Sequence, residues 1–469
     1  MSNPHVVILG AGPAGVGAAF QLARRRFARV TVLEQNSWVG GIAGSFELSG
    51  LRVDFGSHRL HSCDPGILKD IKTLLGDNLL NRPRHGRIKL HGRWIHFPLK
   101  FLDVVLRMPP RFALGVVNDL LAKVYRKKAA SSDGENFSSV LEEGLGRTVC
   151  RNFYFPYMRK IWGLSPERLS ATQARRRVSV NSITKMIAKV LPSTRGRGHF
   201  FYPQDGFGQI SEAYYRAACE AGAQFYLNAR VESVEIKGRD MYNVYYKNDG
   251  QVLSLGANHV WSTIPITTLT KGLRPSAPPD ILHAAERISY RAMILIYLVL
   301  EKSRFSEYDA YYFPEPEIMI SRLSEPKNYS NSQGPKNLTV LCAELPCDPD
   351  DPEWNKSDEE LGQLVYESLN KAGIPVEAPI KQVITRRLRE AYPIYYQGYE
   401  SYFKQLETWL EQRDGLLTFG RQGLFVHDNI HHALSMGYCA AECLDKNGHF
   451  DRERWKEFRK IFETYVVED

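Results

Sequence analysis

A glycine-rich turn directly after the first apolar run constrains the fold of this chain more than any other feature. Residues 5–9 (HVVIL) have strand character, residues 10–15 (GAGPAG) follow, and residues 16–26 have the periodicity of a helix. Residues 29–33 (RVTVL) return to strand character. This order predicts a βαβ unit that binds a dinucleotide, and the complete unit favours that interpretation over a glycine-rich loop without a ligand.

The residues of the turn have distinct geometric roles. Gly10 permits the tight turn, Gly12 lets a diphosphate approach the backbone, and Gly15 lets the helix pack closely against the strand. Pro13 and Ala14 open the helix, whose N-terminal dipole and N–H groups favour an anion. We therefore predict that the diphosphate of a dinucleotide lies against this turn.

The residues that follow the second strand indicate which dinucleotide is bound. Glu34 ends that strand, where a carboxylate can accept hydrogen bonds from an unphosphorylated adenosine ribose. Seven residues later stands the pair Gly40 and Gly41, within the segment SWVGG. This segment resembles an extension in flavoproteins of the amine-oxidase superfamily, where the glycine pair lies close to the FAD diphosphate. The resemblance implies FAD rather than NAD as the cofactor.

Composition and charge exclude several classes of protein. Of 469 residues, 43% are hydrophobic and 24% are charged, which excludes a coiled coil, a collagen-like polymer and a wholly disordered chain. The net charge of +9 suits an anionic partner, but the chain lacks the interleaved aromatic and basic motifs of nucleic-acid binding. We find no apolar stretch long enough to cross a bilayer and no export signal at the start, and we expect a cytoplasmic protein.

The order of expected elements predicts an α/β fold with discontinuous domains. A Rossmann-like FAD-binding domain is expected from residues 1–62, 200–275 and 395–469. A mainly helical lobe, residues 63–199, and an antiparallel β-rich substrate domain, residues 276–394, are inserted into it. A substrate cleft is expected where these parts meet.

Residues 111–128 form an amphipathic helical pattern that ends in a basic cluster. We expect this helix to pack inside the helical lobe, because basic residues at a helix C-terminus are favoured by the dipole. The alternative is contact with a membrane surface.

Beyond these features, the chain resembles the UDP-galactopyranose mutase branch of the amine-oxidase-like flavoproteins from end to end. Residues 55–61 (FGSHRLH) are similar to a loop of that branch, which implies that His58 lies beside the flavin ring, although Ser57 replaces a proline. Residues 156–163 (PYMRKIWG) give the sharpest match. The resemblance implies that Tyr157 stacks on uracil and that Trp162 packs against the sugar, whereas aromatic residues near a helix end are more often core.

Three further residues match substrate-binding positions of the branch. Arg176 lies 14 residues after Trp162, at the spacing of a mutase arginine close to flavin and substrate. Arg322 is similar to an arginine that clamps the diphosphate, and Tyr392, in the segment YPI, is similar to a tyrosine that meets a phosphate. Guanidinium groups bind phosphate oxygens in pairs and stay charged when desolvated, so both arginines suit this role. The alternative for each arginine is an interdomain salt bridge or an exposed charge.

Two later segments resemble the remaining flavin contacts of the same proteins. Val231 begins a β meander that is similar to their second nucleotide-domain segment. Gly420 and Arg421, in the segment FGRQG, resemble their closing flavin motif. Both segments are therefore expected to contribute to the FAD site.

The closing motif then departs from the pattern of the branch. Residues 426–429 (VHDN) replace its usual Tyr-x-Asp-Met, so the flavin contacts of this segment differ from the family pattern. His427, Asp428, His431 and His432 raise the alternative of a metal site, but no clear third ligand accompanies His427 and His431. We predict no metal.

The resemblance implies redox-neutral chemistry on a nucleotide-activated sugar or a related anionic glycoside. His58, Arg176, Arg322 and Tyr392 are the expected catalytic residues, FAD would act in its reduced form, and an external flavin reductant would be needed. The alternative is an FAD-dependent oxidase or desaturase that removes hydride from a small metabolite. The arginines separate the two hypotheses, because an apolar substrate would leave them unpaired at a cost of several kcal/mol.

Overall fold

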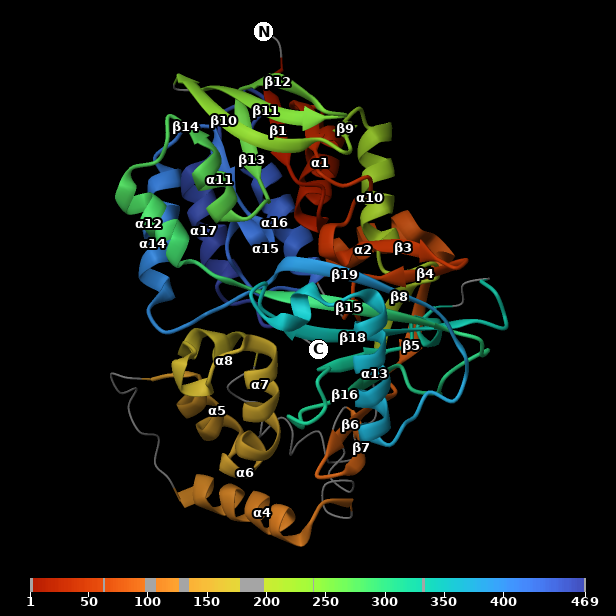
Figure 1. Ribbon diagram of the computed structural model, residues 1–469. Helices are drawn as coiled ribbons and strands as arrows, with labels where there is room; N and C mark the ends of the chain where they lie inside the picture. Colours follow the sequence, from red (N-terminus) through yellow and green to blue (C-terminus); the bar gives the residue numbers. More distant parts are fainter. Residues whose placement is uncertain are drawn as a thin grey trace.

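The computed structural model describes residues 3–61, 64–97, 107–125, 135–177, 198–238, 240–330 and 334–467. A five-stranded parallel sheet of order β20-β13-β1-β2-β9 forms the centre of one half of the molecule (Figure 1). Its strands are β1 (His5–Leu9), β2 (Arg29–Leu33), β9 (Gln224–Tyr226), β13 (His259–Ser262) and β20 (Leu416–Thr418). The predicted α/β class and βαβ unit are confirmed.

Helices cover one face of this sheet and make a glycine-dependent contact with one another. They are α1 (Pro13–Arg25), α2 (Pro65–Leu75), α10 (Gln209–Glu220), α16 (Ile430–Glu442) and α17 (Arg452–Phe462). A Cβ atom at Gly437 of α16 would lie only 2.5 Å from the carbonyl oxygen of Ala14. The close approach of α16 to α1 therefore requires glycine at this position. It brings the segment around α16 to the start of α1.

A β meander and three helices cover the other face. The meander contains β10 (Arg230–Gly238), β11 (Met241–Asn248) and β12 (Gln251–Ala257), to which β14 (Leu273–Arg274) adds. The helices are α11 (Ile266–Gly272), α12 (Pro279–Arg287) and α14 (Tyr399–Glu411). Alternate residues Val244 and Tyr246 of β11 are buried in the core between them, as the period of a strand requires. The predicted meander is confirmed.

A seven-stranded sheet of order β19-β15-β18-β17-β16-β6-β7 forms the second half of the molecule. Its strands are β6 (Gly86–Leu90), β7 (Arg93–Phe97), β15 (Tyr290–Leu300), β16 (Ala310–Tyr312), β17 (Arg322–Ser324), β18 (Thr339–Cys347) and β19 (Ile380–Pro393). Helix α13 (Asp358–Ala372) covers one face, and the hairpin of β3 (Ser45–Leu48) and β4 (Leu51–Asp54) covers the other. Because both faces are covered, β15 is apolar almost throughout.

Two expected domain boundaries differ from the structure. Strands β6 and β7 were expected within the helical lobe, but β6 pairs in parallel with β16 and so extends the seven-stranded sheet. Helix α2 was also expected in that lobe, but Ile67 and Ile71 pack into the core beside the parallel sheet. Strand β5 (Leu79–Pro83) pairs with β8 (His199–Pro203). Sequence order alone does not reveal such long-range pairings.

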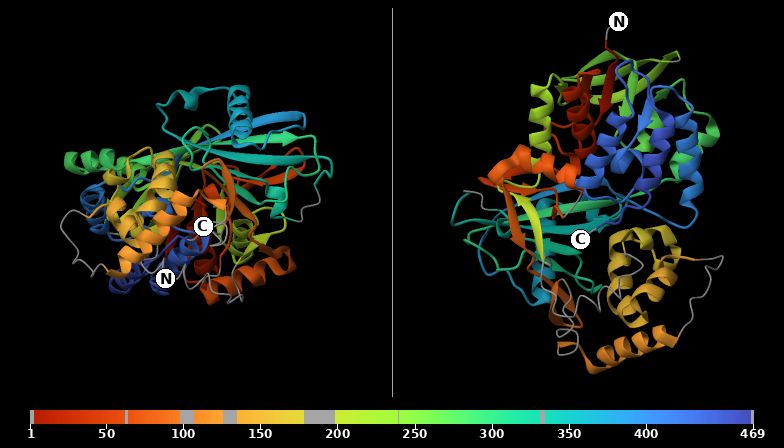
Figure 2. Two further views of the ribbon diagram at one scale, coloured as in Figure 1. Left: turned by 90° about the horizontal axis from the view of Figure 1, so that it is seen from below. Right: turned by 180° about the vertical axis from the view of Figure 1, so that it is seen from behind.

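Another group of helices forms a lobe beside the seven-stranded sheet, as the right view of Figure 2 shows. They are α4 (Pro110–Tyr125), α5 (Phe137–Leu145), α6 (Arg147–Val149), a π-helical turn (Cys150–Tyr154), α7 (Phe155–Trp162) and α8 (Ala171–Arg177). Phe112 and Val116 of α4 pack as expected, whereas Leu114, Val117 and Leu121 are exposed. Within the described parts of the chain, no helix is both long and apolar enough to span a bilayer.

Candidate active site

One cavity of about 850 Å³ lies where the two halves of the molecule meet. The β1–α1 turn, the end of β2 and the start of α15 (Gly420–Gly423) line one end. Residues of α7, β16, β17 and β18 line the other end, and β19 runs along the wall between them. The cavity therefore joins the predicted nucleotide site to the predicted substrate domain.

Within the glycine turn, each glycine has a different environment. A Cβ atom at Gly15 would lie 2.0 Å from the carbonyl oxygen of Gly10, so α1 packs on the turn at a distance that excludes any side chain. Gly10 has a φ of +96°, which favours glycine. At Gly12, by contrast, a Cβ atom would have no neighbour within 4 Å among the described residues. Gly12 therefore presents open backbone to the cavity.

The second glycine pair completes a cradle around this backbone. The Gly40 N–H donates to the carbonyl oxygen of Ala11 at 2.8 Å, which holds the pair against the turn. A Cβ atom at Gly41 would lie 3.6 Å from the Gly12 Cα atom. Among the described residues, no side chain caps the N-terminus of α1, which begins at Pro13. An uncapped helix N-terminus between bare glycine backbones fits a diphosphate.

Glu34 lies where the ribose was expected and is 5% exposed. Its Oε2 accepts from the Ala11 N–H at 2.8 Å, and its Oε1 accepts from the backbone and side-chain N–H groups of Asn36 at 3.0 and 2.7 Å. Burial raises the pKa of Glu34, while these hydrogen bonds lower it. The carboxylate is thus fixed in orientation at the cavity wall, and the cradle with Glu34 fits the FAD that the sequence predicts.

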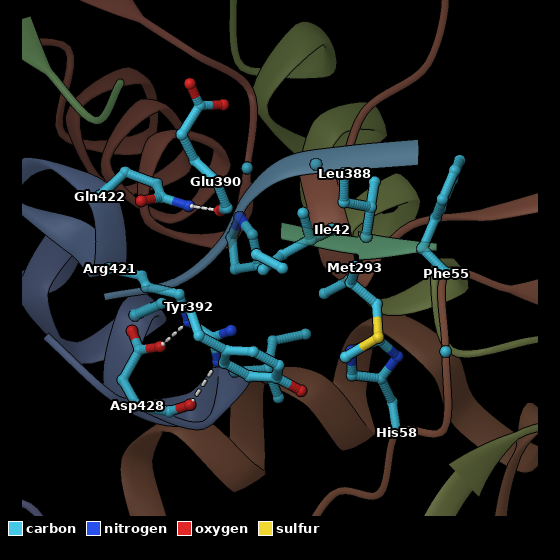
Figure 3. A pocket seen from close by; sticks show the side chains of 18 of the residues that line it. Ile42, Phe55, His58, Met293, Leu388, Glu390, Tyr392, Arg421, Gln422 and Asp428 are labelled. Carbon is cyan, nitrogen blue, oxygen red and sulfur yellow. Dashed lines mark hydrogen bonds and ion pairs between the residues drawn. The ribbon is translucent and has the colours of Figure 1, made fainter. Parts of the chain in front are cut away.

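His58 lines the other end of the cavity, on the loop that follows β4. Its ring stacks on Phe207, with ring centroids 5.2 Å apart. Burial lowers its pKa to about 3, with further contributions from Arg322 and Arg421. The imidazole is therefore neutral near pH 7. Figure 3 shows His58 beside Met293, across the cavity from Arg421.

Arg322 and Glu344 form a buried ion pair directly opposite each other on β17 and β18. The Arg322 Nε and Nη2 atoms lie 2.9 and 2.7 Å from Glu344 Oε1. The same oxygen accepts from the Ser57 N–H at 3.0 Å. Glu344 therefore connects the predicted substrate arginine to the loop that carries His58.

Arg421 forms a second ion pair, with Asp428. The Arg421 Nε donates to Asp428 Oδ1 at 2.6 Å, and its Nη2 donates to the Asp428 carbonyl oxygen at 2.6 Å (Figure 3). Burial raises the pKa of Asp428, and Arg421 and then Arg176 oppose that rise. This ion pair links Arg421 to residues 426–429, the segment that departs from the family pattern.

Three tyrosines line the cavity on the side of Arg322. Tyr157 of α7 and Tyr312 of β16 meet edge to face, with ring centroids 6.4 Å apart. The Arg322 guanidinium carbon lies 6.0 Å from the Tyr312 ring centroid, and Tyr392 comes from β19. Tyr312 and Glu344 were not predicted from the sequence, since only strand pairing places them here.

Most predicted site residues line this one cavity. They are Gly10, Gly12, Pro13, Ala14, Glu34, Gly41, His58, Tyr157, Arg322, Tyr392, Gly420 and Arg421. Gly15 and Gly40 stand behind the wall and support the turn, for the packing reasons given above. The structure thus brings together residues up to 411 positions apart in the sequence, from Gly10 to Arg421.

Besides Gly15 and Gly40, three predicted residues are not part of the cavity lining formed by the described residues. Trp162 is 1% exposed, and its Nε1 donates to the Met158 sulfur at 3.3 Å, so it belongs to the core beneath Tyr392. Arg176 lies close to Asp428, and its carbonyl oxygen accepts from the Val467 N–H at 2.9 Å. Val231 packs beside the core of the β meander.

Arg59 and Asp309 form a third buried pair that the sequence did not reveal. Their Nη2 and Oδ1 atoms lie 3.1 Å apart, and Arg59 Nη1 donates to the Tyr312 hydroxyl at 3.1 Å. The histidine cluster has other contacts, since His432 stacks on Tyr465. In the described parts of the chain, no group of three His, Cys, Asp or Glu side chains could hold a metal ion.

Comparison with known proteins identifies the family to which this site belongs. The model of the flavin-containing amine oxidoreductase family matches residues 13–444. The chain belongs to this family. A crystal structure of reduced UDP-galactopyranose mutase has the same fold, with a TM-score of 0.79 at 20% identity and 94% of each chain covered.

Two curated relatives are oxidoreductases by name. Phytoene dehydrogenase from Streptomyces griseus is 25% identical over 321 residues, which cover 61% of this chain and 59% of that protein. An L-amino-acid oxidase from Bungarus fasciatus is 27% identical over 331 residues, which cover 66% and 60%. The chain therefore spans about three fifths of the length of these relatives.

The family and the cradle together identify the cofactor. FAD is the cofactor of this chain, which is a flavin-dependent enzyme with the α/β fold of its family. Gly12, Ala14 and Gly41 form the backbone cradle that fits its diphosphate, and Glu34 stands where its ribose is expected.

Proposed function

We propose that this flavoenzyme rearranges a nucleotide-activated sugar, or a related anionic glycoside, without a net change in oxidation state. The observation that supports the proposal is the grouping of Tyr157, Tyr312, Tyr392 and Arg322 at the His58 end of the cavity. Phenol hydroxyls donate to and accept from sugar hydroxyls and phosphate oxygens, and a guanidinium donates to phosphate. An apolar substrate would form no hydrogen bonds with this group of polar side chains.

Arg322 keeps donors for a substrate despite its ion pair. Glu344 takes the Nε and Nη2 edge of the guanidinium, and no hydrogen bond from Nη1 to the described residues is present. Because a guanidinium has five N–H donors, Nη1 is left to bind an oxygen of the substrate. Ser321, adjacent in sequence, also lines the cavity.

Bound FAD in its reduced form would supply the nucleophile for the anomeric carbon, so an external reductant belongs to this proposal. His58, neutral because burial lowers its pKa to about 3, would neither add positive charge nor compete for the substrate anion. The likeness of the whole fold to a UDP-galactopyranose mutase supports the same proposal.

A second candidate, an oxidase or dehydrogenase of a small metabolite, is supported by the ion pairs. The guanidiniums of Arg59, Arg322 and Arg421 each have a carboxylate partner, so less positive charge remains for a diphosphate. The names of the curated relatives support it as well. In this case oxidised FAD would accept hydride from the substrate.

Anaerobic turnover separates the two candidates. We expect dithionite-reduced protein to convert UDP-galactopyranose or another UDP-sugar into an isomer, with no net consumption of reductant. Turnover that requires oxidised FAD and an electron acceptor, with amines, amino acids or polyenes as substrates, would instead establish the oxidoreductase.

A variant tests the assigned role of Arg322 in the same assay. Arg322→Lys keeps the charge but removes the forked donor geometry, and we expect KM to rise about tenfold, which corresponds to about 1.4 kcal/mol, with FAD content unchanged. Arg452→Lys, in a surface pair with Asp414, is the matched control. Equal KM values for the two variants would remove Arg322 from the substrate site.

A further inference from the structure

Lys160 of α7 is enclosed by the loop that joins β16 to β17. Its Nζ atom donates to four backbone carbonyl oxygens, those of Phe313 at 2.5 Å, Glu315 at 2.8 Å, Ile318 at 2.6 Å and Ile320 at 3.3 Å. An ammonium group has three donors, so these four acceptors exhaust its capacity. Each acceptor comes from the same short loop.

This contact is not an ion pair. Among the described residues, no carboxylate lies within salt-bridge distance of Lys160. Burial lowers its pKa to about 7, and the more distant Glu317 and Glu315 oppose that change. A partly buried lysine that has hydrogen bonds only to backbone carbonyl oxygens pays a desolvation cost, which these four contacts offset.

Both sides of the contact carry residues of the cavity wall. On α7, Tyr157 lies one turn before Lys160 and Ile161 follows it, and both line the cavity. On the hairpin, Tyr312 precedes the loop and Arg322 follows it. These two residues face each other in strand register.

Other hydrogen bonds hold this loop to strands of the sheet, such as that from the Gly92 N–H to Glu315 Oε1 at 2.8 Å. The Phe313 N–H donates to the Ser321 carbonyl oxygen at 3.0 Å and closes the loop. Ser321 in turn donates to the Glu344 carbonyl oxygen through its N–H at 2.8 Å and its hydroxyl at 3.1 Å. Among the described residues, the hydrogen bonds of Lys160 link the loop between Phe313 and Ser321 to the helical lobe, while Arg291 of β15 donates to the Ile161 carbonyl oxygen at 3.2 Å.

We propose that Lys160 is a positioning residue that sets the distance between Tyr157 and Arg322 across the substrate end of the cavity. It holds α7 of the helical lobe against the β16–β17 hairpin of the seven-stranded sheet. The proposal rests on the proposed function only in placing the substrate at this end. It does not depend on which reaction takes place there.

The experiment compares Lys160→Met with a matched surface variant, both as FAD-loaded full-length protein. Methionine keeps the length and apolar stem of lysine but has no donor. Lys404→Met removes an exposed lysine that pairs with Glu407 on α14. The readouts are FAD content, amide hydrogen exchange of residues 313–322, and the dissociation constant of UDP from the change in the flavin spectrum.

We expect Lys160→Met to keep its FAD, to exchange residues 313–322 at least tenfold faster, and to bind UDP at least tenfold more weakly. Lys404→Met should match the wild type in all three readouts. Wild-type exchange and wild-type UDP affinity in Lys160→Met would overturn the proposal. Faster exchange with unchanged UDP affinity would also overturn it, since Lys160 would then have only a structural role.

Two further outcomes are distinguishable. If the wild type does not bind UDP, the proposed function fails, and hydrogen exchange together with iodide quenching of flavin fluorescence decides the role of Lys160. Quenching should then rise at least twofold in Lys160→Met, and unchanged quenching would overturn the proposal. If Lys160→Met does not fold, Lys160→Gln takes its place. Its shorter side chain has two N–H donors for four carbonyl oxygens, so we expect faster exchange and weaker UDP binding by about threefold or more, and wild-type values of both would overturn the proposal.

Discussion

The two ends of the cavity are built in different ways. The dinucleotide end consists mostly of backbone, largely from the stretch between Gly10 and Gly41 with the start of α15 beside it, and Glu34 is a fixed side chain there. The His58 end consists of side chains from α7, β16, β17, β18 and β19, held by ion pairs such as Arg322 to Glu344. A backbone cradle accepts any ligand with a diphosphate, whereas a group of side chains selects a substrate.

The first test of this difference between the two ends concerns Gly12, where the backbone faces the cavity without a side chain. Gly12→Asp should leave the fold intact, because a Cβ atom there meets no described atom within 4 Å, but it places a carboxylate against the diphosphate. We expect FAD affinity to fall about 100-fold or more, which corresponds to about 2.7 kcal/mol, as measured by flavin absorbance.

Gly15→Ala should instead lower the free energy of unfolding by about 3 kcal/mol, since its Cβ atom would meet the Gly10 carbonyl oxygen. Similar behaviour of the two variants would contradict this division of roles.

At the side-chain end, stability should depend on a pair and not on single residues. Arg322→Met leaves Glu344 buried and unpaired, and we expect a loss of about 3 kcal/mol or more in the free energy of urea unfolding. Arg322→Met with Glu344→Gln should recover at least about 1.5 kcal/mol of that loss. FAD content should stay near the wild-type value in both. Additive losses in the double variant would show that the two residues are not coupled.

A smaller effect is expected for Glu34, the buried carboxylate at the dinucleotide end. Glu34→Gln removes the charge and one acceptor, and we expect the dissociation constant of FAD to rise about tenfold. Glu47→Gln, at an exposed position on β3, is the control and should bind FAD like the wild type. Titration of the apoprotein with FAD, followed by flavin fluorescence, measures both. An unchanged constant for Glu34→Gln would mean that the cradle depends on backbone alone.

The last prediction concerns pH. Because the pKa of folded His58 is lowered to about 3, the unfolded chain binds one more proton than the folded chain below pH 6.5. Stability therefore falls as the pH decreases from 6.5 toward 3, by about 1.4 kcal/mol per pH unit for this group. His58→Asn should reduce that slope by about one proton in urea unfolding between pH 6.5 and 4.5. An identical slope would show that His58 is protonated in the folded protein.

The difference between the two ends also explains what the sequence could predict. The cradle is local in sequence, so the spacing of Gly10, Gly12 and Gly41 was sufficient to find it. The partners of Arg322 were not predicted, because Glu344 becomes its neighbour only through the pairing of β17 with β18. Family resemblance placed Tyr157 correctly at the cavity but also placed Trp162 there, whereas Trp162 packs in the core one layer behind Tyr392.

The contacts of Lys160 could not be predicted from the sequence either. It stands in the segment that gave the sharpest resemblance, PYMRKIWG. The resemblance implied roles for Tyr157 and Trp162 but none for Lys160. A lysine near a helix end is ordinarily a solvated charge. Its hydrogen bonds form because the loop between Phe313 and Ser321 folds around it. This contact is distant in sequence, so no local pattern predicts it.

The order of strands in the parallel sheet bears on how this protein acquires its cofactor during synthesis. The outer strand β20 ends at Thr418, and Gly420 and Arg421 at the cradle follow it, about nine tenths of the way along the chain. A ribosome must therefore add 410 residues after Gly10 before the last wall of the flavin site, at Gly420, exists. A nascent chain interrupted ahead of β20 would release an apoprotein with an unfinished binding site.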